Sequence, residues 1–241
     1  LDNFLGTEGD DTFNGIYYAG NGDKTSTLSS LDTLDARGGK DTLNLTVLKN
    51  GAVTTIAMDD IDVAMRGVSN IENLNIRSEV AFGTTAFTVN KGLDNLSIQT
   101  IGEVKIEGNP AGTSGTDTKE KISIDTTGPL KLVAGEVTKE VIAKSSAGAV
   151  TVNAAKLEGK VSIDAGQGAD LTAAKAQEVV IKAKGNANIT ADKATKVNIN
   201  LNDKANTLTI TTSHPLAEAT DVTLSNLKLT AATAVAKATK I

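Results

Sequence analysis

The stretch VSIDAGQGADLTAAKAQEVVI, residues 161–181, holds one full unit of a pattern that recurs through most of the chain. It begins with Val161-Ser162-Ile163 and ends with Val179-Val180-Ile181, and in both triads apolar residues flank the central position. Such alternation is typical of a strand with one buried face. Counting every second triad, starts fall at residues 122, 141, 161, 179 and 197, which are 19, 20, 18 and 18 residues apart. This period predicts an all-β fold, a parallel β-solenoid of the β-roll or β-helix kind with 18–20 residues and about two strands per coil.

Composition agrees with a narrow core. Aromatic residues make up 2% of the 241 residues, and all six lie before residue 88. The rest of the chain must therefore pack Val, Ile, Leu, Ala and Thr, which suits thin stacked strands better than a wide core. A β-sandwich would need longer strands and more variable connections. The chain has no cysteine, so we expect stacking or bound metal, rather than disulfides, to stabilise it.

Two regions differ in composition. Residues 1–67 are rich in Gly and Asp, and residues 68–241 carry the short strands, interrupted by an expected exposed loop at 108–121. A short helix is expected near residues 56–66, where Asp59 and Asp60 suit a helix N-terminus. The chain starts at Leu1 and stops in mid-pattern at Ile241, so we expect it to be a piece of a longer protein.

The first region contains two related nine-residue segments. Gly6-Thr7-Glu8-Gly9-Asp10-Asp11-Thr12-Phe13-Asn14 is followed by Ala36-Arg37-Gly38-Gly39-Lys40-Asp41-Thr42-Leu43-Asn44. Both fit the calcium nonapeptide pattern G-G-x-G-x-D-x-U-x, in which U is a large apolar residue. Glycine allows the tight turn, aspartate supplies a hard oxygen ligand for Ca²⁺, and the apolar residue begins an inward-facing strand.

These segments resemble RTX-type bacterial surface proteins, and Val68-Ser69-Asn70-Ile71-Glu72-Asn73-Leu74-Asn75-Ile76 is similar to a phrase of surface-layer (S-layer) proteins. The resemblance implies a type I secreted, extracellular protein that uses Ca²⁺ to assemble into a coat on the bacterial cell surface. The chain departs from the family pattern at Thr7, Ala36 and Arg37, where glycines are expected. Asp11 and Asp41 are also further apart than one ordinary coil, and an insertion such as Tyr17 to Ser29 would restore their alignment.

The candidate metal ligands lie in and beside these segments. They are Gly6, Gly9, Asp10, Asp11, Asp23, Asp32, Asp35, Gly39 and Asp41. The alternative for Asp10, Asp11 and Asp41 is an ordinary Asp-Gly turn at the start of a strand. The sequence favours a solvated turn residue for Asp32, and Asp23 lies in a segment that matches the pattern only weakly. A third glycine turn, Gly166 to Asp170, has Thr172 where the apolar residue belongs.

Other functional classes fit the residues less well. The only histidine, His214, precedes a proline, and no cysteine nucleophile exists, so the sequence indicates no enzyme and no zinc site. The net charge is −5 and only three arginines occur, which disfavours nucleic acid as a partner. No run of about 20 apolar residues indicates a transmembrane helix.

Three functions remain open. The first is a structural S-layer component whose partners are other copies of itself and, at the cell, lipopolysaccharide or other surface polysaccharide. The second is an RTX adhesin segment that binds glycan or a host surface. The third, a polysaccharide-degrading enzyme on a β-helix, would need a groove with acid and base residues, and Arg and Tyr are scarce after residue 87.

Overall fold

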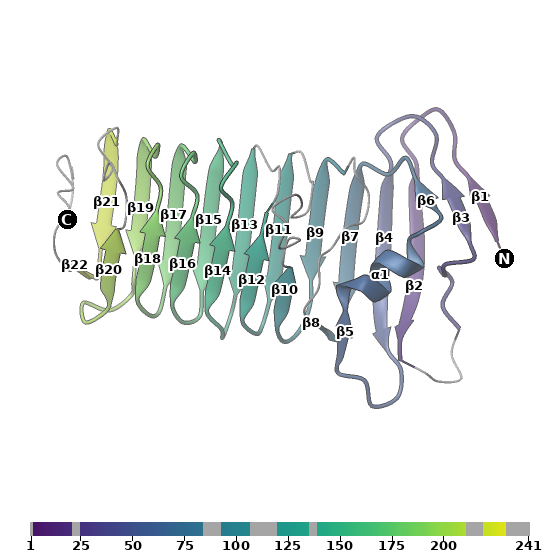
Figure 1. Ribbon diagram of the computed structural model, residues 1–241, viewed down its shortest axis with the longest axis horizontal. Helices are drawn as coiled ribbons and strands as arrows, with labels where there is room; N and C mark the ends of the chain where they lie inside the picture. The colour runs from purple at the N-terminus through teal and green to yellow at the C-terminus, as the bar shows by residue number, and fades with distance from the viewer. Residues whose placement is uncertain are drawn as a thin grey trace.

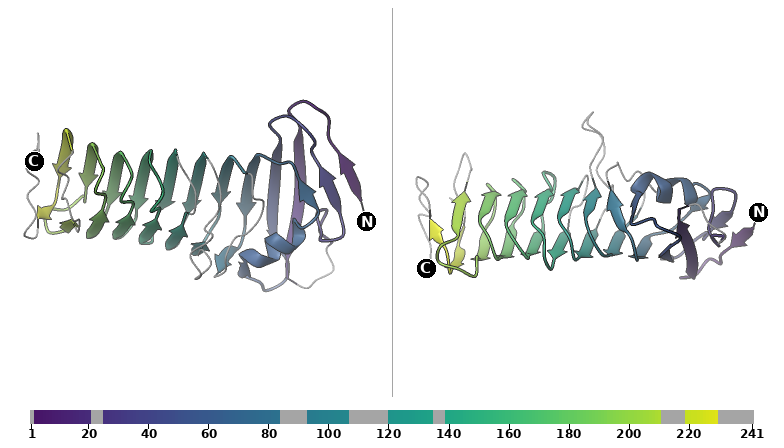
Figure 2. Two further views of the ribbon diagram at one scale, coloured as in Figure 1. Left: turned by 45° about the horizontal axis from the view of Figure 1, so that its top comes forward. Right: turned by 90° about the horizontal axis from the view of Figure 1, so that it is seen from below.

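The computed structural model describes residues 2–20, 25–83, 93–106, 120–134, 139–210 and 219–229. The fold is a parallel β-solenoid whose coils follow one another from β1 at one end to β22 at the other (Figure 1). Two long sheets form opposite sides of the rod, as the turned views in Figure 2 show. The predicted fold class is therefore confirmed.

The longer sheet has ten strands stacked in chain order. Its strands are β2 (Thr12–Ala19), β4 (Thr42–Lys49), β7 (Asn73–Ser78), β9 (Asn95–Gln99), β11 (Lys121–Thr126), β13 (Glu140–Ser145), β15 (Lys160–Ala165), β17 (Glu178–Ala183), β19 (Lys196–Asn200) and β21 (Asp221–Ser225).

The opposite sheet has nine shorter strands. They are β5 (Thr55–Ala57), β8 (Ala81–Gly83), β10 (Val104–Ile106), β12 (Leu130–Val133), β14 (Val150–Asn153), β16 (Ala169–Thr172), β18 (Ala187–Thr190), β20 (Thr207–Ile210) and β22 (Lys228–Leu229). A third sheet at the N-terminal end consists of β1 (Asn3–Leu5), β3 (Thr33–Asp35) and β6 (Val68–Ser69).

The register confirms the predicted period. Each triad start pairs with the next one along the chain: Ile122 with Val141, Val141 with Val161, Val161 with Val179, and Val179 with Val197. Side chains at alternate positions of each strand enter the core, as Val161 and Ile163 do in β15. One continuous apolar cluster runs from Ala19 to Leu224, and among the described residues Phe82 is the only phenylalanine with a fully buried side chain. Small aliphatic side chains suffice because the facing sheets are close together.

The outward positions of the ten-stranded sheet form a ladder of alternating charge. In neighbouring strands the first residues pair as Lys121, Glu140, Lys160, Glu178, Lys196 and Asp221. Nζ of Lys121 lies 2.9 Å from the carboxylate of Glu140, and Nζ of Lys160 lies 3.0 Å from that of Glu178. Opposite charges at directly paired positions favour this register over slipped ones.

The N-terminal coils are longer than the rest. Thr12 pairs with Thr42, and Thr42 pairs with Asn73, so successive coils there span 30 and 31 residues. The expected alignment of Asp11 with Asp41 across a lengthened coil is confirmed. The extra residues begin later than the expected Tyr17, because Tyr17 to Ala19 continue β2 and pair with β4.

The expected helix near 56–66 is confirmed as α1 (Met58–Ala64). It directly follows β5, the first strand of the nine-stranded sheet. No helix in the described part of the chain has the length and apolar character of a membrane span. The expected loop at 108–121 lies outside the described residues except for its last two residues, Glu120 and Lys121, of which Lys121 already begins β11. Phe87 and His214 also lie outside them.

Candidate functional site

The two nonapeptide-like turns lie one above the other at one corner of the solenoid. The pairing of β2 with β4 places Asp11 next to Asp41, and the pairing of β4 with β7 places Asp41 next to Glu72. We call Asp11, Asp41 and Glu72 the acidic corner. Each of the three residues directly precedes a strand of the ten-stranded sheet.

Hydrogen bonds connect the acidic corner across the coils. The backbone N–H of Asp11 donates to Oδ1 of Asp41 (2.7 Å), and the backbone N–H of Asp41 donates to Oε2 of Glu72 (2.8 Å). Oδ2 of Asp11 accepts from the backbone N–H of Thr7 (2.6 Å) and from its hydroxyl (2.9 Å). The carboxylates of Asp41 and Glu72 thus each bond the backbone of the preceding coil, whereas the carboxylate of Asp11 holds its own turn together.

Asp41 is the most enclosed member of the acidic corner. Its relative exposure is 0%, and its Oδ2 has no hydrogen-bond partner. A buried carboxylate oxygen without a partner is costly, because the water it lost has not been replaced by another donor or by a cation. With Asp11 and Glu72 half-buried beside it, the corner concentrates negative charge around one unsatisfied oxygen.

The turns approach one another too closely for most side chains. Gly39 has φ +127°, and a Cβ atom there would lie 2.6 Å from the carbonyl carbon and oxygen of Gly9. A Cβ on Gly6 would lie 2.5 Å from the carbonyl oxygen of Ala36 and 2.9 Å from Oδ2 of Asp11. Glycine at these positions lets backbone carbonyls and carboxylates from two coils share one small volume.

Arg37 explains how the second turn forms without its expected glycine. Its φ is +67°, the left-handed conformation that glycine adopts most easily. The backbone N–H of Arg37 donates to Oδ1 of Asp35 (3.0 Å), which holds the turn in this conformation. The turn geometry of the pattern therefore survives the substitution.

The other predicted ligands lie around this corner rather than in it. Oδ1 of Asp10 accepts from the backbone N–H of Lys40 (2.8 Å), and the N–H of Gly9 donates to the hydroxyl of Thr7 (3.2 Å). Oδ1 of Asp35 also accepts from the side chain of Asn70 (2.7 Å). The Asn70 amide and the N–H of Arg37 together hold the pKa of Asp35 below its ordinary value.

Asp32 belongs to a different turn. Its Oδ1 accepts from the backbone N–H of Asp2 (2.9 Å), and its Oδ2 accepts from the N–H and the hydroxyl of Ser29 (both 2.8 Å). The hydrogen bond from Asp2, followed by that from the Ser29 hydroxyl, lowers the pKa of Asp32. Asp32 thus ties the start of the chain to the turn before β3. Asp23 lies outside the described residues.

Glu72 was not predicted as a site residue, although the sequence carries a signal for it. Glu72-Asn73-Leu74-Asn75 repeats the arrangement of Asp41-Thr42-Leu43-Asn44, with an acid, a polar residue, an apolar residue and an asparagine. The asparagines confirm the alignment, since the Nδ2 groups of Asn44 and Asn75 donate to Oδ1 of Asn14 (3.0 Å) and of Asn44 (2.9 Å), respectively.

The acidic position continues beyond the corner. Asp94 precedes β9 and Glu120 precedes β11, so five successive strands of the ten-stranded sheet follow an acidic residue. Lys139 occupies this position before β13 and forms an ion pair with Glu120. The last of these five acidic residues, Glu120, is thus neutralised by Lys139, whereas Oδ2 of Asp41 has no such partner.

Within the described residues, no three His, Cys, Asp or Glu side chains are grouped so that they could hold a metal ion by themselves. A cation at the corner would therefore need other oxygen ligands beside the carboxylates, such as backbone carbonyls. The chain matches no protein-family model, no curated protein and no solved structure.

Proposed function

We propose that the protein is a structural component of a bacterial surface layer that binds Ca²⁺ at the acidic corner, folds with its help and assembles into a cell-surface lattice. The observation that carries the proposal is the buried Oδ2 of Asp41, which has no hydrogen-bond partner although Oδ1 of the same carboxylate bonds the neighbouring coil. A cation at this place would neutralise the charge that burial penalises.

The oxygen donors at the corner suit calcium. Oδ2 of Asp41 would bind the ion together with backbone carbonyl oxygens of the stacked turns, and Asp11 and Glu72 would add negative charge beside it. Ca²⁺ prefers six to eight hard oxygen ligands from carboxylates and carbonyls, whereas transition metals favour imidazole and thiolate. Bound calcium would supply positive charge that links neighbouring coils.

The rod itself supports a structural role. Its core is continuous, and its outer positions carry ladders of paired amides and charges that repeat from coil to coil. Such a solenoid resists bending and slipping because each coil contacts its neighbours along its full width. Long regular faces of this kind suit lateral contact with other copies.

Calcium dependence would also delay folding of the N-terminal coils until the chain is outside the cell. Extracellular modules bind Ca²⁺ at about 10⁻⁴ to 10⁻³ M, far above cytosolic levels. An unneutralised acidic corner would weaken the N-terminal coils before secretion, and calcium outside the cell would stabilise them. Folding and assembly would then be coupled to arrival at the cell surface.

Calcium titration tests the proposal. We expect the melting temperature of chelator-treated protein to rise by about 5–10 °C when Ca²⁺ reaches 100 times its dissociation constant. Electron microscopy of the intact protein with Ca²⁺ should show ordered two-dimensional arrays. An unchanged melting temperature at millimolar Ca²⁺ would defeat the calcium site, and the absence of arrays would defeat the coat.

A further inference from the structure

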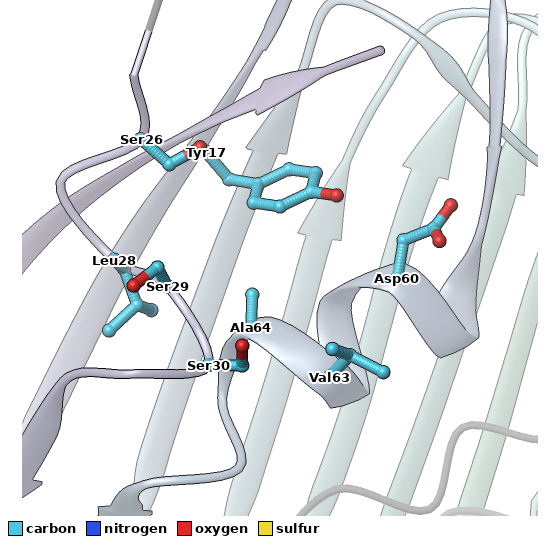
Figure 3. Close-up of a pocket in the computed structure, with 8 residues that line it drawn as sticks. All are labelled: Tyr17, Ser26, Leu28, Ser29, Ser30, Asp60, Val63 and Ala64. Atoms are coloured by element: carbon cyan, nitrogen blue, oxygen red, sulfur yellow. The ribbon is translucent and has the colours of Figure 1, made fainter. Parts of the chain in front are cut away.

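A hollow of about 240 Å³ lies at the N-terminal end of the rod, away from the acidic corner. It occurs where α1, rather than a strand of the nine-stranded sheet, lies opposite β2 (Figure 3). We call it the Tyr17 hollow, and its lining residues are Tyr17, Ser26, Leu28, Ser29, Ser30, Asp60, Val63 and Ala64. Its volume is below the roughly 300–1,000 Å³ of pockets for drug-sized ligands, so it suits a single ring.

Tyr17 presents both a ring and a hydroxyl to the hollow. The side chain extends from β2 between the segment that carries Ser26 and Ser29 and the helix that carries Asp60 (Figure 3). Burial, and then the negative charge of Asp60, raise the pKa of Tyr17 above its ordinary value of 10.0. The hydroxyl is therefore protonated at neutral pH, and it both donates and accepts hydrogen bonds.

Asp60 supplies the one formal charge among the lining residues. Its Oδ2 accepts from the backbone N–H of Ala57 (3.2 Å), which caps the start of α1 and fixes the position of the carboxylate. An ionised carboxylate has about four acceptor sites, so acceptor capacity is left for a ligand. Since the lining contains no Lys, Arg or His, an anionic ligand would meet only repulsion.

The serines and the apolar residues complete the surface. The hydroxyl oxygen of Ser26 accepts from the backbone N–H of Tyr18 (3.0 Å), and this leaves its own O–H as a donor. Leu28, Val63 and Ala64 provide aliphatic contacts on the walls of the hollow. The ligand that fits carries no negative charge, is ring-sized and rich in hydroxyl groups, and is apolar on one face.

We infer that the Tyr17 hollow binds a neutral pyranose unit of a surface polysaccharide. The sugar hydroxyls would donate to Asp60 and exchange hydrogen bonds with Tyr17 and Ser26, while its C–H face packs on the apolar wall. One shallow site binds weakly, but many copies in a surface array bind a polymer far more tightly through avidity. The inference names a ligand for the proposed surface protein and does not depend on calcium at the acidic corner.

Saturation-transfer NMR tests the inference on calcium-saturated protein, with methyl α-D-glucopyranoside, methyl α-D-mannopyranoside, methyl α-D-galactopyranoside and glucuronate as probes. At least one neutral glycoside should bind, and glucuronate should bind at least five-fold more weakly. Methyl signals of Leu28 and Val63 should shift on titration, whereas that of Ala219, at the far end of the rod, should not. This footprint is measured on the unmodified protein.

Two variants remove single groups from the hollow. Tyr17→Phe keeps the ring and Asp60→Asn keeps the size of the side chain, and each should weaken binding at least five-fold. Tyr18→Phe is the matched control, because Tyr18 is the next residue of β2 and points to the other face. Equal loss in Tyr18→Phe, tighter binding of glucuronate, or no binding of any neutral glycoside would overturn the inference.

A further variant separates this inference from the calcium proposal. Asp41 lies outside the hollow, so Asp41→Asn should bind the glycoside as the unmodified protein does even where its calcium response is lost. Loss of glycoside binding in Asp41→Asn, with its folded structure intact by circular dichroism, would contradict a separate sugar site.

Discussion

Oδ1 of Asp41 accepts a hydrogen bond of 2.7 Å from the backbone N–H of Asp11, a residue 30 positions earlier in the chain. This bond places the second oxygen of Asp41 inside the corner, where it has no partner. We therefore propose two functions for the carboxylate of Asp41. One oxygen aligns two coils, and the other would bind the proposed cation.

Replacement of Asp41 by Asn should separate these two functions. The Asn side chain retains an oxygen that can accept from the N–H of Asp11, but it has no charge. In chelator we expect a melting temperature equal to or above that of the unmodified protein, because an unpaired buried charge is removed. The calcium-induced rise should be lost, as followed by thermal unfolding at several Ca²⁺ concentrations.

Asp170→Asn is the control for this prediction. Asp170 lies at an outward position of β16, and its carboxylate accepts from the side chain of Asn188 (2.6 Å). Its replacement should leave the calcium response unchanged. A normal calcium response in Asp41→Asn would show that calcium, if bound, acts elsewhere.

Gly39→Ala should destabilise the N-terminal coils by about 3 kcal/mol. The added Cβ would overlap the carbonyl group of Gly9 at 2.6 Å, in a backbone conformation that alanine avoids. Gly51→Ala separates the effect of steric overlap from that of the backbone conformation. Gly51 also has a positive φ (+66°), but no atom lies within 4 Å of the added Cβ. It should cost only about 1–2 kcal/mol.

Urea unfolding measures both glycine variants under identical conditions. Equal losses of free energy of unfolding in the two variants would mean that the contact between the two stacked turns contributes nothing.

The alternating charges predict that swapping the two residues of one ion pair lowers the stability of the fold. In the double variant Lys160→Glu/Glu178→Lys the pair itself persists, but residue 160 then meets Glu140 and residue 178 meets Lys196. Because these side chains are partly exposed, we expect a loss of about 1 kcal/mol at low salt. The loss should shrink at 1 M salt, where screening acts within about 3 Å.

Glu178→Gln is the companion variant, because it breaks the 3.0 Å pair with Lys160 without placing like charges together. It should cost less than the exchange, about 0.2–1 kcal/mol. Urea unfolding at two salt concentrations compares them, and an exchange variant as stable as the unmodified protein would show that the ladder does not favour the register.

Acid should destabilise the N-terminal end through Asp32 and Asp35. Hydrogen bonds lower the pKa of both residues below the ordinary value of 3.8. The stability they contribute is therefore fully present above pH 4 and is lost as the pH falls through their lowered values. Asp32→Asn should flatten the dependence of melting temperature on pH between about 4 and 2, and an unchanged dependence would contradict this role.

Much of the fold can be read from single positions. The alternation in Val161-Ser162-Ile163 sets which side chains are buried, and the spacing from 122 to 197 sets the coil length, because stacked parallel strands keep the same positions inward. The two turns that contain glycine and aspartate could also be predicted from the sequence. Where the lengthening of the first coil begins could not be predicted, because β2 continues through Tyr17 to Ala19 and is longer than the strands that set the period.

The sequence by itself determined that the chain is a stack of β-coils and that its first two turns carry acids in a fixed place. These are local properties, since alternation and turn chemistry act within a few residues. Tertiary structure alone decided that Glu72 joins Asp41, that one oxygen of Asp41 is buried without a partner, and that Asp60 lies near Tyr17. Asp41 and Glu72 are 31 positions apart, and Tyr17 and Asp60 are further apart still. Their geometry depends on how coils of unequal length pack.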